Sequence, residues 1–263
     1  KRKPRRLLRR LGMLMAGIGV FGIIVFVIAA AWVSRDLPDP DKLTDRQIAQ
    51  STKIYDRSGA NLLYEVTSEQ NPEKRTLVRY EDLPEDLING LIATEDKKFW
   101  NHWGIRPESI LRSIVYGIIG KSRVGGGAST LTQQLVKNAI LTNERTLSRK
   151  LREVIMAVRL EQKYSKEQIL QIYFNEIPYG RTNYGVEAAA QSYFGKSAME
   201  LNLEQLATLA GLPKAPSRYL RDRTALKARR DFVLERMVEE GYLTREKADA
   251  AQKTEPSLQI RVG

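Results

Sequence analysis

An uncharged apolar stretch of 23 residues dominates the N-terminal part of the chain. It runs from Leu11 to Val33 and reads LGMLMAGIGVFGIIVFVIAAAWV. As a helix it would rise about 35 Å, enough to cross a hydrocarbon core of about 30 Å. It lacks the polar stripe of a buried helix in a water-soluble domain. The small residues 29–31 also fit a cleaved signal peptide, but the apolar run is long for one. We therefore expect a retained transmembrane helix at residues 11–33.

Positive charge is concentrated immediately before this stretch. Seven of residues 1–10 are Lys or Arg, which predicts a cytoplasmic basic tail. The chain would then be a single-pass protein of the cytoplasmic membrane, with its N-terminus in the cytoplasm and everything after Val33 extracytoplasmic. Nucleic acid is scarce there, so the formal net charge of +12 favours a membrane surface or a phosphorylated substrate and no nucleic-acid partner. The chain has no cysteine, which excludes disulfides and thiolate metal sites.

The chain after the anchor changes from polar to weakly β and then to helical. Residues 34–50 are polar and contain proline, and are expected to form a juxtamembrane stalk. Strand signals at 52–55 and 62–66 flank the turn signal at 56–59, and a third candidate strand spans 75–80. These signals predict a small, marginal sheet.

From Pro84 onward the patterns are helical. Pro84 suits the first position of a helix, where its missing N–H costs nothing. Apolar stripes at helical spacing comprise Leu87, Ile88, Leu91 and Ile92 in this helix and Leu151, Val154, Ile155 and Val158 in a later one. Further helical patterns cover roughly 131–141, 166–176, 185–193, 203–211, 225–240 and 244–252. The body of the chain is therefore predicted to be mostly α.

Glu95 is the first candidate for chemistry. It follows Leu91 by four residues and so prolongs the apolar stripe of its helix. Partial desolvation raises the pKa of a carboxylic acid, and a general base needs a pKa near the working pH. Asp96, beside it, could assist by like-charge coupling or act as a cap and hydrogen-bonding group. A solvated acidic pair at a helix end is the common alternative, and the residues alone favour it.

A second candidate segment follows a glycine-rich break at 125–127. A helix N-terminus with exposed backbone N–H groups suits anions, and hydroxyl, amide and ammonium side chains suit phosphates and sugars. An N-capped helix with an ordinary polar face is the alternative. The phosphate-binding loop Gly-x-x-x-x-Gly-Lys-Ser/Thr is absent. The side chains concerned are Ser129, Thr130, Gln134, Lys137 and Asn138.

The third candidate segment groups one acid, Glu153, with three basic residues, Arg149, Lys150 and Arg152. On a helix, Glu153 would lie four residues from Arg149 and three from Lys150, on a charged face away from the Leu151 stripe. A solvated, salt-bridged surface is the usual meaning of such a cluster. The functional alternative is an anion site in which Glu153 orients the cations or carries a proton.

Taken in order, these segments resemble the motifs of the family 51 peptidoglycan glycosyltransferases. Residues 95–104 (EDKKFWNHWG) resemble the first motif, 127–138 (GASTLTQQLVKN) the second, and 149–153, continuing through 166–175, the third. Residues 184–195 and 203–219 are similar to the fourth and fifth. The similarity covers roughly residues 54–242. The turn at 181–183 departs from the family, which more usually has a glycine-rich turn there.

The resemblance implies an all-α, lysozyme-like fold of two lobes around a cleft, with a small β element. It places a glycosyltransferase domain at 51–220, with a membrane-associated jaw near 105–123, and C-terminal helices and a linker at 221–263. The implied reaction polymerises the lipid-linked disaccharide-pentapeptide precursor, lipid II, into β-1,4 glycan strands with inversion and release of polyprenyl pyrophosphate.

The resemblance also implies roles for individual residues. Glu95 matches the general base, and Glu153 the second acid, which organises the pyrophosphate region with or without a divalent cation (Mg²⁺ or Mn²⁺); no tightly bound cofactor is expected. His102, the only histidine, is expected to be structural or orienting. The expected substrate-binding residues are Asp96, His102, Ser129, Thr130, Gln134, Lys137, Asn138, Arg145, Arg149 and Lys150.

Several alternatives remain open at this point. A lysozyme-like fold could cleave glycan instead of building it, although a lytic enzyme would not need the cationic sites. An inactive membrane-anchored scaffold would be expected to lack Glu95 or Glu153. The chain contains no Ser-x-x-Lys motif, so it cannot itself be a penicillin-binding transpeptidase. It could be a monofunctional enzyme, or part of a bifunctional protein whose partners include a transpeptidase domain and other cell-wall synthesis proteins.

Overall fold

The computed structural model describes residues 12–13, 17, 20, 31, 37, 52–58, 62–66, 73–109, 129–140, 146–256 and 258. The predicted basic tail, most of the predicted anchor and stalk, and the predicted jaw beyond residue 109 lie outside these residues. Among the residues that are described, no helix is long and apolar enough to cross a membrane.

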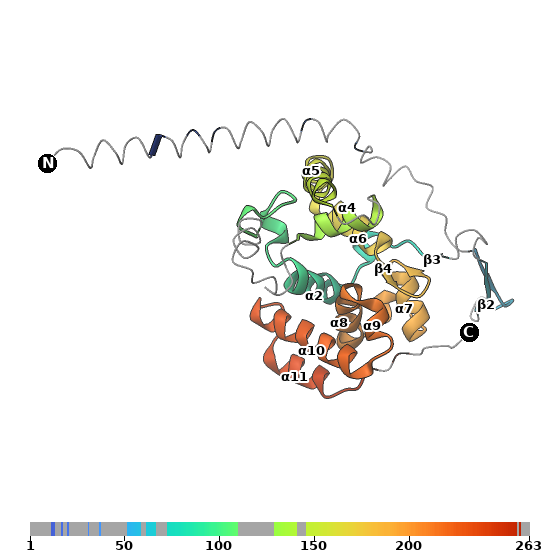
Figure 1. Ribbon diagram of the computed structural model, residues 1–263. Coiled ribbons are helices and arrows are strands. Elements are labelled where there is room, and N and C mark those ends of the chain that lie inside the picture. Colours follow the sequence, from blue (N-terminus) through green and yellow to red (C-terminus); the bar gives the residue numbers. More distant parts are fainter. Residues whose placement is uncertain are drawn as a thin grey trace.

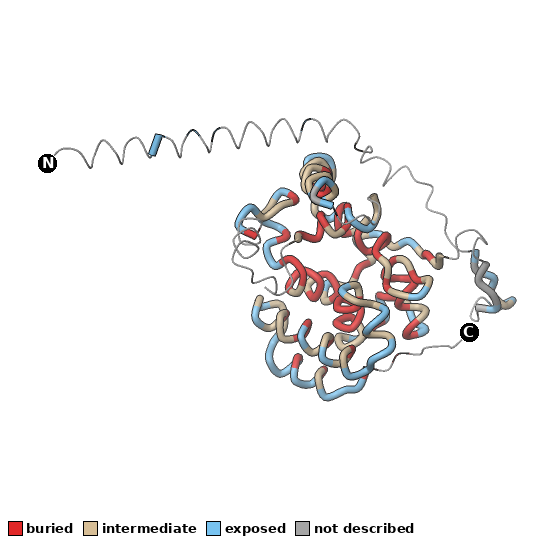
Figure 2. Tube along the Cα trace, in the orientation of Figure 1, coloured by how far each residue is buried: buried red, intermediate tan, exposed pale blue. Residues whose placement is uncertain are grey.

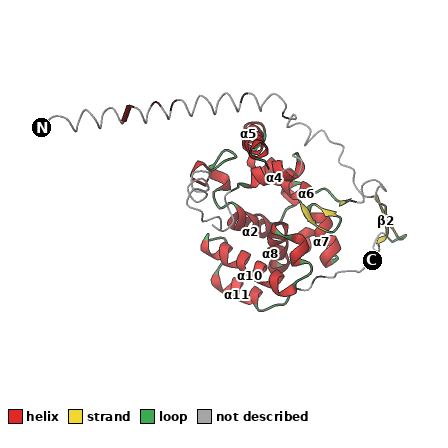
Figure 3. Ribbon diagram, in the orientation of Figure 1, coloured by secondary structure: helices red, strands yellow, loops and turns green. Residues whose placement is uncertain are grey.

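The described chain is mostly helical, with a few short strands, as predicted (Figures 1 and 3). The helices are α2 (Glu85–Glu95), α4 (Leu131–Ala139), α5 (Leu147–Lys163), α6 (Lys166–Glu176), α7 (Val186–Phe194), α8 (Leu203–Gly211), α9 (Pro216–Tyr219), α10 (Arg223–Glu239) and α11 (Arg245–Gln252). Single turns of 3-10 helix lie at Tyr80–Asp82, Phe99–Asn101, Ala198–Glu200 and Leu212–Lys214. The strands are β1 (Thr52–Tyr55), β2 (Leu62–Val66), β3 (Lys74–Arg75), β4 (Pro178–Gly180) and β5 (Asn183–Tyr184).

The strands form two small sheets rather than one. β1 and β2 pair antiparallel, as the sequence predicts. The prediction of a third strand over 75–80 is wrong beyond Arg75, because β3 ends there and pairs in parallel with β5. Past that point the backbone N–H groups of Val78 and Tyr80 are bound by the side chains of Asn175 and Gln171, at 2.9 Å each, in place of a strand partner. The β4–β5 hairpin was missed because its strands have only three and two residues.

Capping side chains set the beginnings of several helices. Ser165 forms a reciprocal capping box with Gln168 before α6, and Asn202 forms one with Gln205 before α8. These two helices begin and end at the predicted residues. Pro84 is the N-cap of α2 and not its first helical residue, so that prediction is wrong by one position.

Two groups of helices form the core. In the first, α2, α8 and α10 pack together, and the predicted Leu87 stripe of α2 is buried. The packing is close at Gly90, where an added Cβ would lie 3.1 Å from the Cβ of Ala210 and 3.2 Å from Val233 Cγ1. In the second group, α4 packs against α5 and α6. Figure 2 shows buried residues along the facing sides of these helices.

The predicted orientation of α5 is wrong. Its buried residues are Glu153, Met156, Ala157 and Leu160, whereas the predicted stripe of Leu151, Val154, Ile155 and Val158 is only half-buried. Both sets have helical spacing, so periodicity alone could not choose between them. The packing at Gly104 shows which face is covered, because an added Cβ there would lie 2.6 Å from the carbonyl oxygen of Ala157. Glu153 consequently belongs to the packed face and not to a solvated one.

Candidate active site

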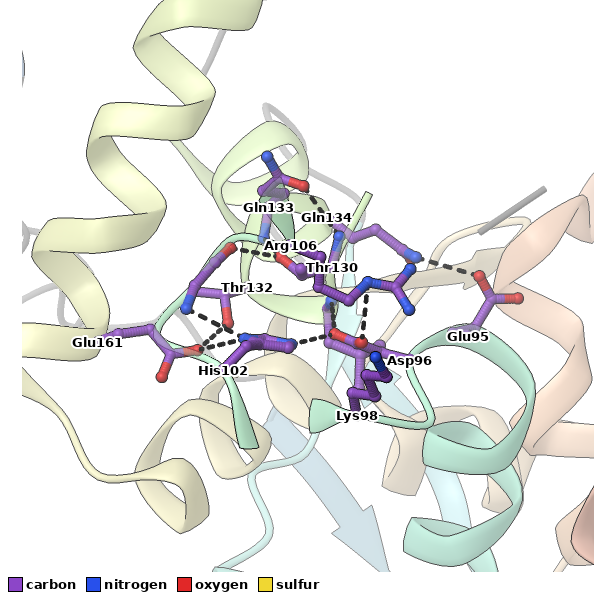
Figure 4. A network of polar contacts seen from close by, with 12 residues as sticks. Glu95, Asp96, Lys98, His102, Arg106, Thr130, Thr132, Gln133, Gln134 and Glu161 are labelled. Atoms are coloured by element: carbon purple, nitrogen blue, oxygen red, sulfur yellow. Dashed lines mark hydrogen bonds and ion pairs between the residues drawn. The ribbon is translucent and has the colours of Figure 1, made fainter. Parts of the chain in front are cut away.

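The buried Asp96 links the first motif to the second through hydrogen bonds. It follows α2 directly and is 1% exposed. Its Oδ2 accepts hydrogen bonds from the backbone N–H of Leu131, at 3.0 Å, and from His102 Nε2, at 2.8 Å (Figure 4). Because Leu131 is the first residue of α4, the carboxylate lies at the positive end of that helix. Asp96 thereby fixes the end of α2 to the start of α4.

His102 lies between Asp96 and Gly104 and is hydrogen-bonded to both. The Gly104 N–H donates to His102 Nδ1 at 3.1 Å, so Nε2 carries the hydrogen that is donated to Asp96. The Thr130 hydroxyl, fully buried, donates to the carbonyl of Gly104 at 2.6 Å. Asp96, His102 and Thr130 thus contact protein in this structure. Their roles in substrate binding stay a prediction, and their burial favours a positioning role.

Glu161 of α5, whose side chain is 4% exposed, supports the same loop. Its Oε1 accepts hydrogen bonds from Thr132 Oγ1, at 2.6 Å, and from Lys166 Nζ, at 2.8 Å. Lys166 also donates to the carbonyl of His102, at 2.6 Å. The first motif is therefore held between α4, α5 and α6, and this network keeps the loop after Glu95 in place (Figure 4).

Glu95 lies at the last residue of α2 and is 8% exposed, which confirms its predicted partial burial. Its Oε2 accepts a hydrogen bond from Gln134 Nε2 of α4, at 3.1 Å. The buried Tyr173 hydroxyl donates to Gln134 Oε1 at 3.3 Å, which fixes the amide with its nitrogen towards Glu95. Burial and the neighbouring Glu95 charge hold the pKa of Tyr173 well above its usual value, so this hydroxyl remains a donor. Glu95 therefore lies where the two helix groups meet.

Lys150 connects the second and third motifs. Its Nζ donates to Ser129 Oγ at 3.0 Å and forms an ion pair with the buried Glu153. Arg149, on the same helix, is half-buried. Lys137 and Asn138 are exposed near the end of α4, where Asn138 donates to the Gln134 carbonyl at 2.9 Å. Arg145 lies outside the described residues.

The transglycosylase family model matches residues 60–238, more than half of the chain. The chain belongs to the transglycosylase family. The predicted family and the enzyme class, a glycosyltransferase of peptidoglycan synthesis, are thereby confirmed.

The relatives of this transglycosylase chain are much longer than the chain itself. It is 43% identical over 245 residues to penicillin-binding protein 1A of Aquifex aeolicus, covering 92% of this chain and 32% of the relative. It is 38% identical over 231 residues to penicillin-binding protein 1A of Pseudomonas aeruginosa, covering 87% and 27%. A crystal structure of penicillin-binding protein 1A from Haemophilus influenzae matches with a TM-score of 0.46 and 29% identity, covering 80% of this chain and 21% of that one. The chain therefore spans about a third of the length of its curated relatives.

Two cations in the transglycosylase site were missed as site residues by the sequence analysis. Arg229 Nη2 of α10 donates to Glu95 Oε1 at 2.5 Å, and Lys214 Nζ lies 3.9 Å from Glu95 Oε2. Lys214 stands in the segment similar to the fifth motif, so that segment contained the signal. Arg229 lies three residues from Leu226 and four from Val233, both buried, so it flanks the packed stripe of α10. An arginine at such a position could have indicated an inward-facing cation.

The divalent cation that the resemblance implies is expected near Glu153. Among the residues that the structure describes, no three acidic or histidine side chains come together as a metal site. Glu153 is the acid expected to approach a cation, and Lys150 is paired with it. The Mg²⁺ or Mn²⁺ ion accordingly stays a prediction for this transglycosylase.

Proposed function

We propose that this transglycosylase chain polymerises lipid II into β-1,4 glycan strands. The growing lipid-pyrophosphate-linked glycan would be the donor and the lipid-linked disaccharide-pentapeptide the acceptor. The observation that carries the proposal is the position of Glu95, a largely buried carboxylate held by Gln134 and Arg229 at the meeting point of α2, α4 and α10.

The chemistry assigned to Glu95 is general-base catalysis. It would accept the proton of the acceptor sugar's 4-hydroxyl as that oxygen attacks the anomeric carbon of the donor. A carboxylate has about four acceptor positions, so Glu95 can keep its protein partners and still accept this proton. Attack opposite the leaving group inverts the configuration, from the α-linked pyrophosphate to the β-1,4 bond. General-base catalysis of this kind contributes about 10²- to 10⁴-fold in rate.

The cationic side chains of the second and third motifs would stabilise the leaving group. Polyprenyl pyrophosphate gains negative charge in the transition state, and fixed cations near it lower the barrier. Lys137, Arg149 and Lys150 are the described candidates, and Arg145 belongs with them by sequence. Glu153, buried beside Lys150, would hold that lysine in place. Ser129, Gln134 and Asn138 would bind sugar or phosphate oxygens.

A membrane location is part of the proposal. Both substrates carry polyprenyl chains, and the uncharged segment 11–33 after a basic tail would keep the site at the outer face of the cytoplasmic membrane. The jaw near 105–123 would lie at the membrane interface. A transpeptidase domain or other cell-wall synthesis proteins would complete the assembly, since the relatives are named penicillin-binding proteins.

The nature of the product tests this proposal against glycan cleavage. Purified full chain in detergent would be incubated with labelled lipid II, and separately with isolated peptidoglycan. We expect labelled polymer that a muramidase digests, with polyprenyl pyrophosphate released in step. Release of muropeptides from peptidoglycan, with no polymer formed, would contradict the proposal and favour the lytic alternative.

A further inference from the structure

The cation on Glu95 comes from a part of the chain remote from it in sequence. Arg229 and Glu95 are 134 residues apart, and Arg229 Nη2 lies 2.5 Å from Glu95 Oε1. The Arg229 side chain is 12% exposed and that of Glu95 is 8% exposed. A charge-assisted hydrogen bond shielded in this way is stronger than one at the surface. The orientation of the Glu95 carboxylate is therefore coupled to the position of Arg229.

Arg229 is itself held by two further contacts. Its Nε donates to the carbonyl of Gly211, at the end of α8, over 3.2 Å. Its guanidinium lies over the ring of Phe232, with 5.3 Å between the guanidinium carbon and the ring centroid. These contacts fix the guanidinium before any substrate is present.

Gly211 provides the room that this placement needs. A Cβ on Gly211 would lie 3.0 Å from Arg229 Cγ and 3.2 Å from Val233 Cγ2. Such contacts are closer than ordinary van der Waals distances, so an alanine here would push the arginine stem aside by a few tenths of an ångström. The absence of a side chain at position 211 lets Arg229 cross the end of α8 towards Glu95.

The two oxygens of Glu95 are held by different helices. Oε1 is bound by Arg229 of α10, and Oε2 by Gln134 of α4. A general base must present its free acceptor position to the substrate hydroxyl within hydrogen-bonding reach, and a displacement of about 1 Å can cost about 100-fold in rate. Without Arg229, the remaining contacts, the Gln134 hydrogen bond and the Lys214 ammonium at 3.9 Å, would both lie on Oε2, and the position of Oε1 would no longer be set by a contact of its own.

We propose that Arg229 is the positioning residue of the catalytic carboxylate, and that Gly211 is its spacer. This inference rests on the proposed function of Glu95 as general base. Arg229 acts through Glu95, so its loss should lower kcat and leave KM nearly unchanged.

The first test replaces the arginine in the full chain. We expect Arg229→Ala to lower the kcat of lipid II polymerisation by about 10- to 100-fold, the range for a misplaced base, with KM within about twofold of the unaltered chain. Arg229→Lys should retain more activity than Arg229→Ala, and added guanidinium ion should restore part of the kcat of Arg229→Ala. The control is Arg236→Gln, which removes an arginine ion-paired with Glu239 and Glu240 on the same helix and should leave kcat unchanged.

The second test displaces the arginine without removing it. Gly211→Ala crowds Arg229 and Val233, whereas Gly90→Ala crowds Ala210, Val233 and Met237 in the same three-helix packing without touching Arg229. We expect Gly211→Ala to lower kcat several-fold more than Gly90→Ala at a similar unfolding temperature. If Arg229→Ala does not fold, the comparison of Gly211→Ala with Gly90→Ala still tests whether the position of Arg229 affects kcat.

Four results would overturn the inference. A rise in KM with unchanged kcat would assign Arg229 to substrate binding. Equal losses in Arg229→Ala and Arg236→Gln, without guanidinium rescue, would show a general structural effect, and so would equal losses in Gly211→Ala and Gly90→Ala. If Glu95→Gln is inactive while Arg229→Ala is fully active, the positioning role of Arg229 is wrong and the proposed function of Glu95 stands. If Glu95→Gln itself remains active, the proposed function fails.

Discussion

At the scale of single residues, the buried tyrosines of α6, β4 and α7 differ in how their hydroxyls are satisfied. Tyr173 donates to Gln134, and Tyr193 donates to the carbonyls of Tyr179 and Gly180, at 3.1 Å each. The Tyr179 hydroxyl is buried without a hydrogen-bonding partner among the described residues. An unsatisfied buried hydroxyl costs free energy of about 1–3 kcal/mol. Removing the Tyr179 hydroxyl should therefore not destabilise the fold.

We expect Tyr179→Phe to leave the free energy of unfolding unchanged or to raise it by about 1 kcal/mol, because the variant buries no unsatisfied group. Urea denaturation at neutral pH measures this. Tyr193→Phe is the matched control and should lower the free energy of unfolding by about 1 kcal/mol, since it loses a satisfied hydroxyl. Equal destabilisation by the two changes would contradict this account.

Tyr179→Phe should also change how the free energy of unfolding depends on pH. Burial raises the pKa of Tyr179 well above the ordinary tyrosine value, which is about 10 and applies to the unfolded chain. The folded state thus keeps its proton where the unfolded state releases it, so the stability contributed by the neutral phenol is complete below about pH 10 and falls as the pH rises further. Tyr179→Phe should reduce this alkaline loss of stability. An unchanged slope above pH 10 would show that Tyr179 titrates normally.

At the scale of elements, Asp96 joins the end of α2 to the beginning of α4 and to the loop of His102. Two donors, the Leu131 N–H and His102 Nε2, share its Oδ2, and Arg106 Nε lies 3.7 Å from Oδ1. This buried carboxylate therefore connects three segments. The relative placement of Glu95 on α2 and Gln134 on α4 depends on it.

We expect Asp96→Ala to lower the free energy of unfolding by about 3 kcal/mol, because it leaves the two donors buried without an acceptor. Asp96→Asn should cost less, about 1–2 kcal/mol, since an amide oxygen can still accept from both donors while the charge is lost. Chemical denaturation of both variants measures these changes.

Asp249→Ala is the control for losing a carboxylate. Asp249 is exposed and lies 3.9 Å from Arg245 Nη1, so its removal should change stability by no more than about 0.5 kcal/mol. If Asp96→Ala were as mild as Asp249→Ala, Asp96 would not be the fixing point that the geometry indicates.

At the scale of the whole molecule, the features that neighbouring residues in the sequence determine, such as helix ends and apolar stripes, could be predicted from the sequence. The bounds of α6 and α8 follow from the capping residues Ser165 and Asn202, and the burial of Glu95 follows from the stripe of α2. The pairing of Glu95 with Gln134 was not predicted residue by residue, although the ordered motifs placed both in one site.

Features that depend on distant contacts could not be predicted in this way. The buried face of α5 depends on the loop at Gly104, and two faces of that helix have residues at helical spacing. The parallel pairing of β3 with β5 joins residues more than a hundred positions apart. The contact of Arg229 with Glu95 is likewise set by the packing of α10 on α2 and α8. Local pattern carries no information about such contacts.

The central claim is that Glu95 accepts the proton in glycan polymerisation, and the rate of Glu95→Gln polymerisation tests it most directly. Glu85→Gln is the matched control, because Glu85 is an exposed acid on the same helix that contacts Asn89 and not the site. The account predicts a fall in kcat of about 100-fold or more for Glu95→Gln, with normal affinity for a phosphoglycolipid that mimics the donor, and full activity for Glu85→Gln. Turnover of Glu95→Gln close to that of Glu85→Gln would contradict the account.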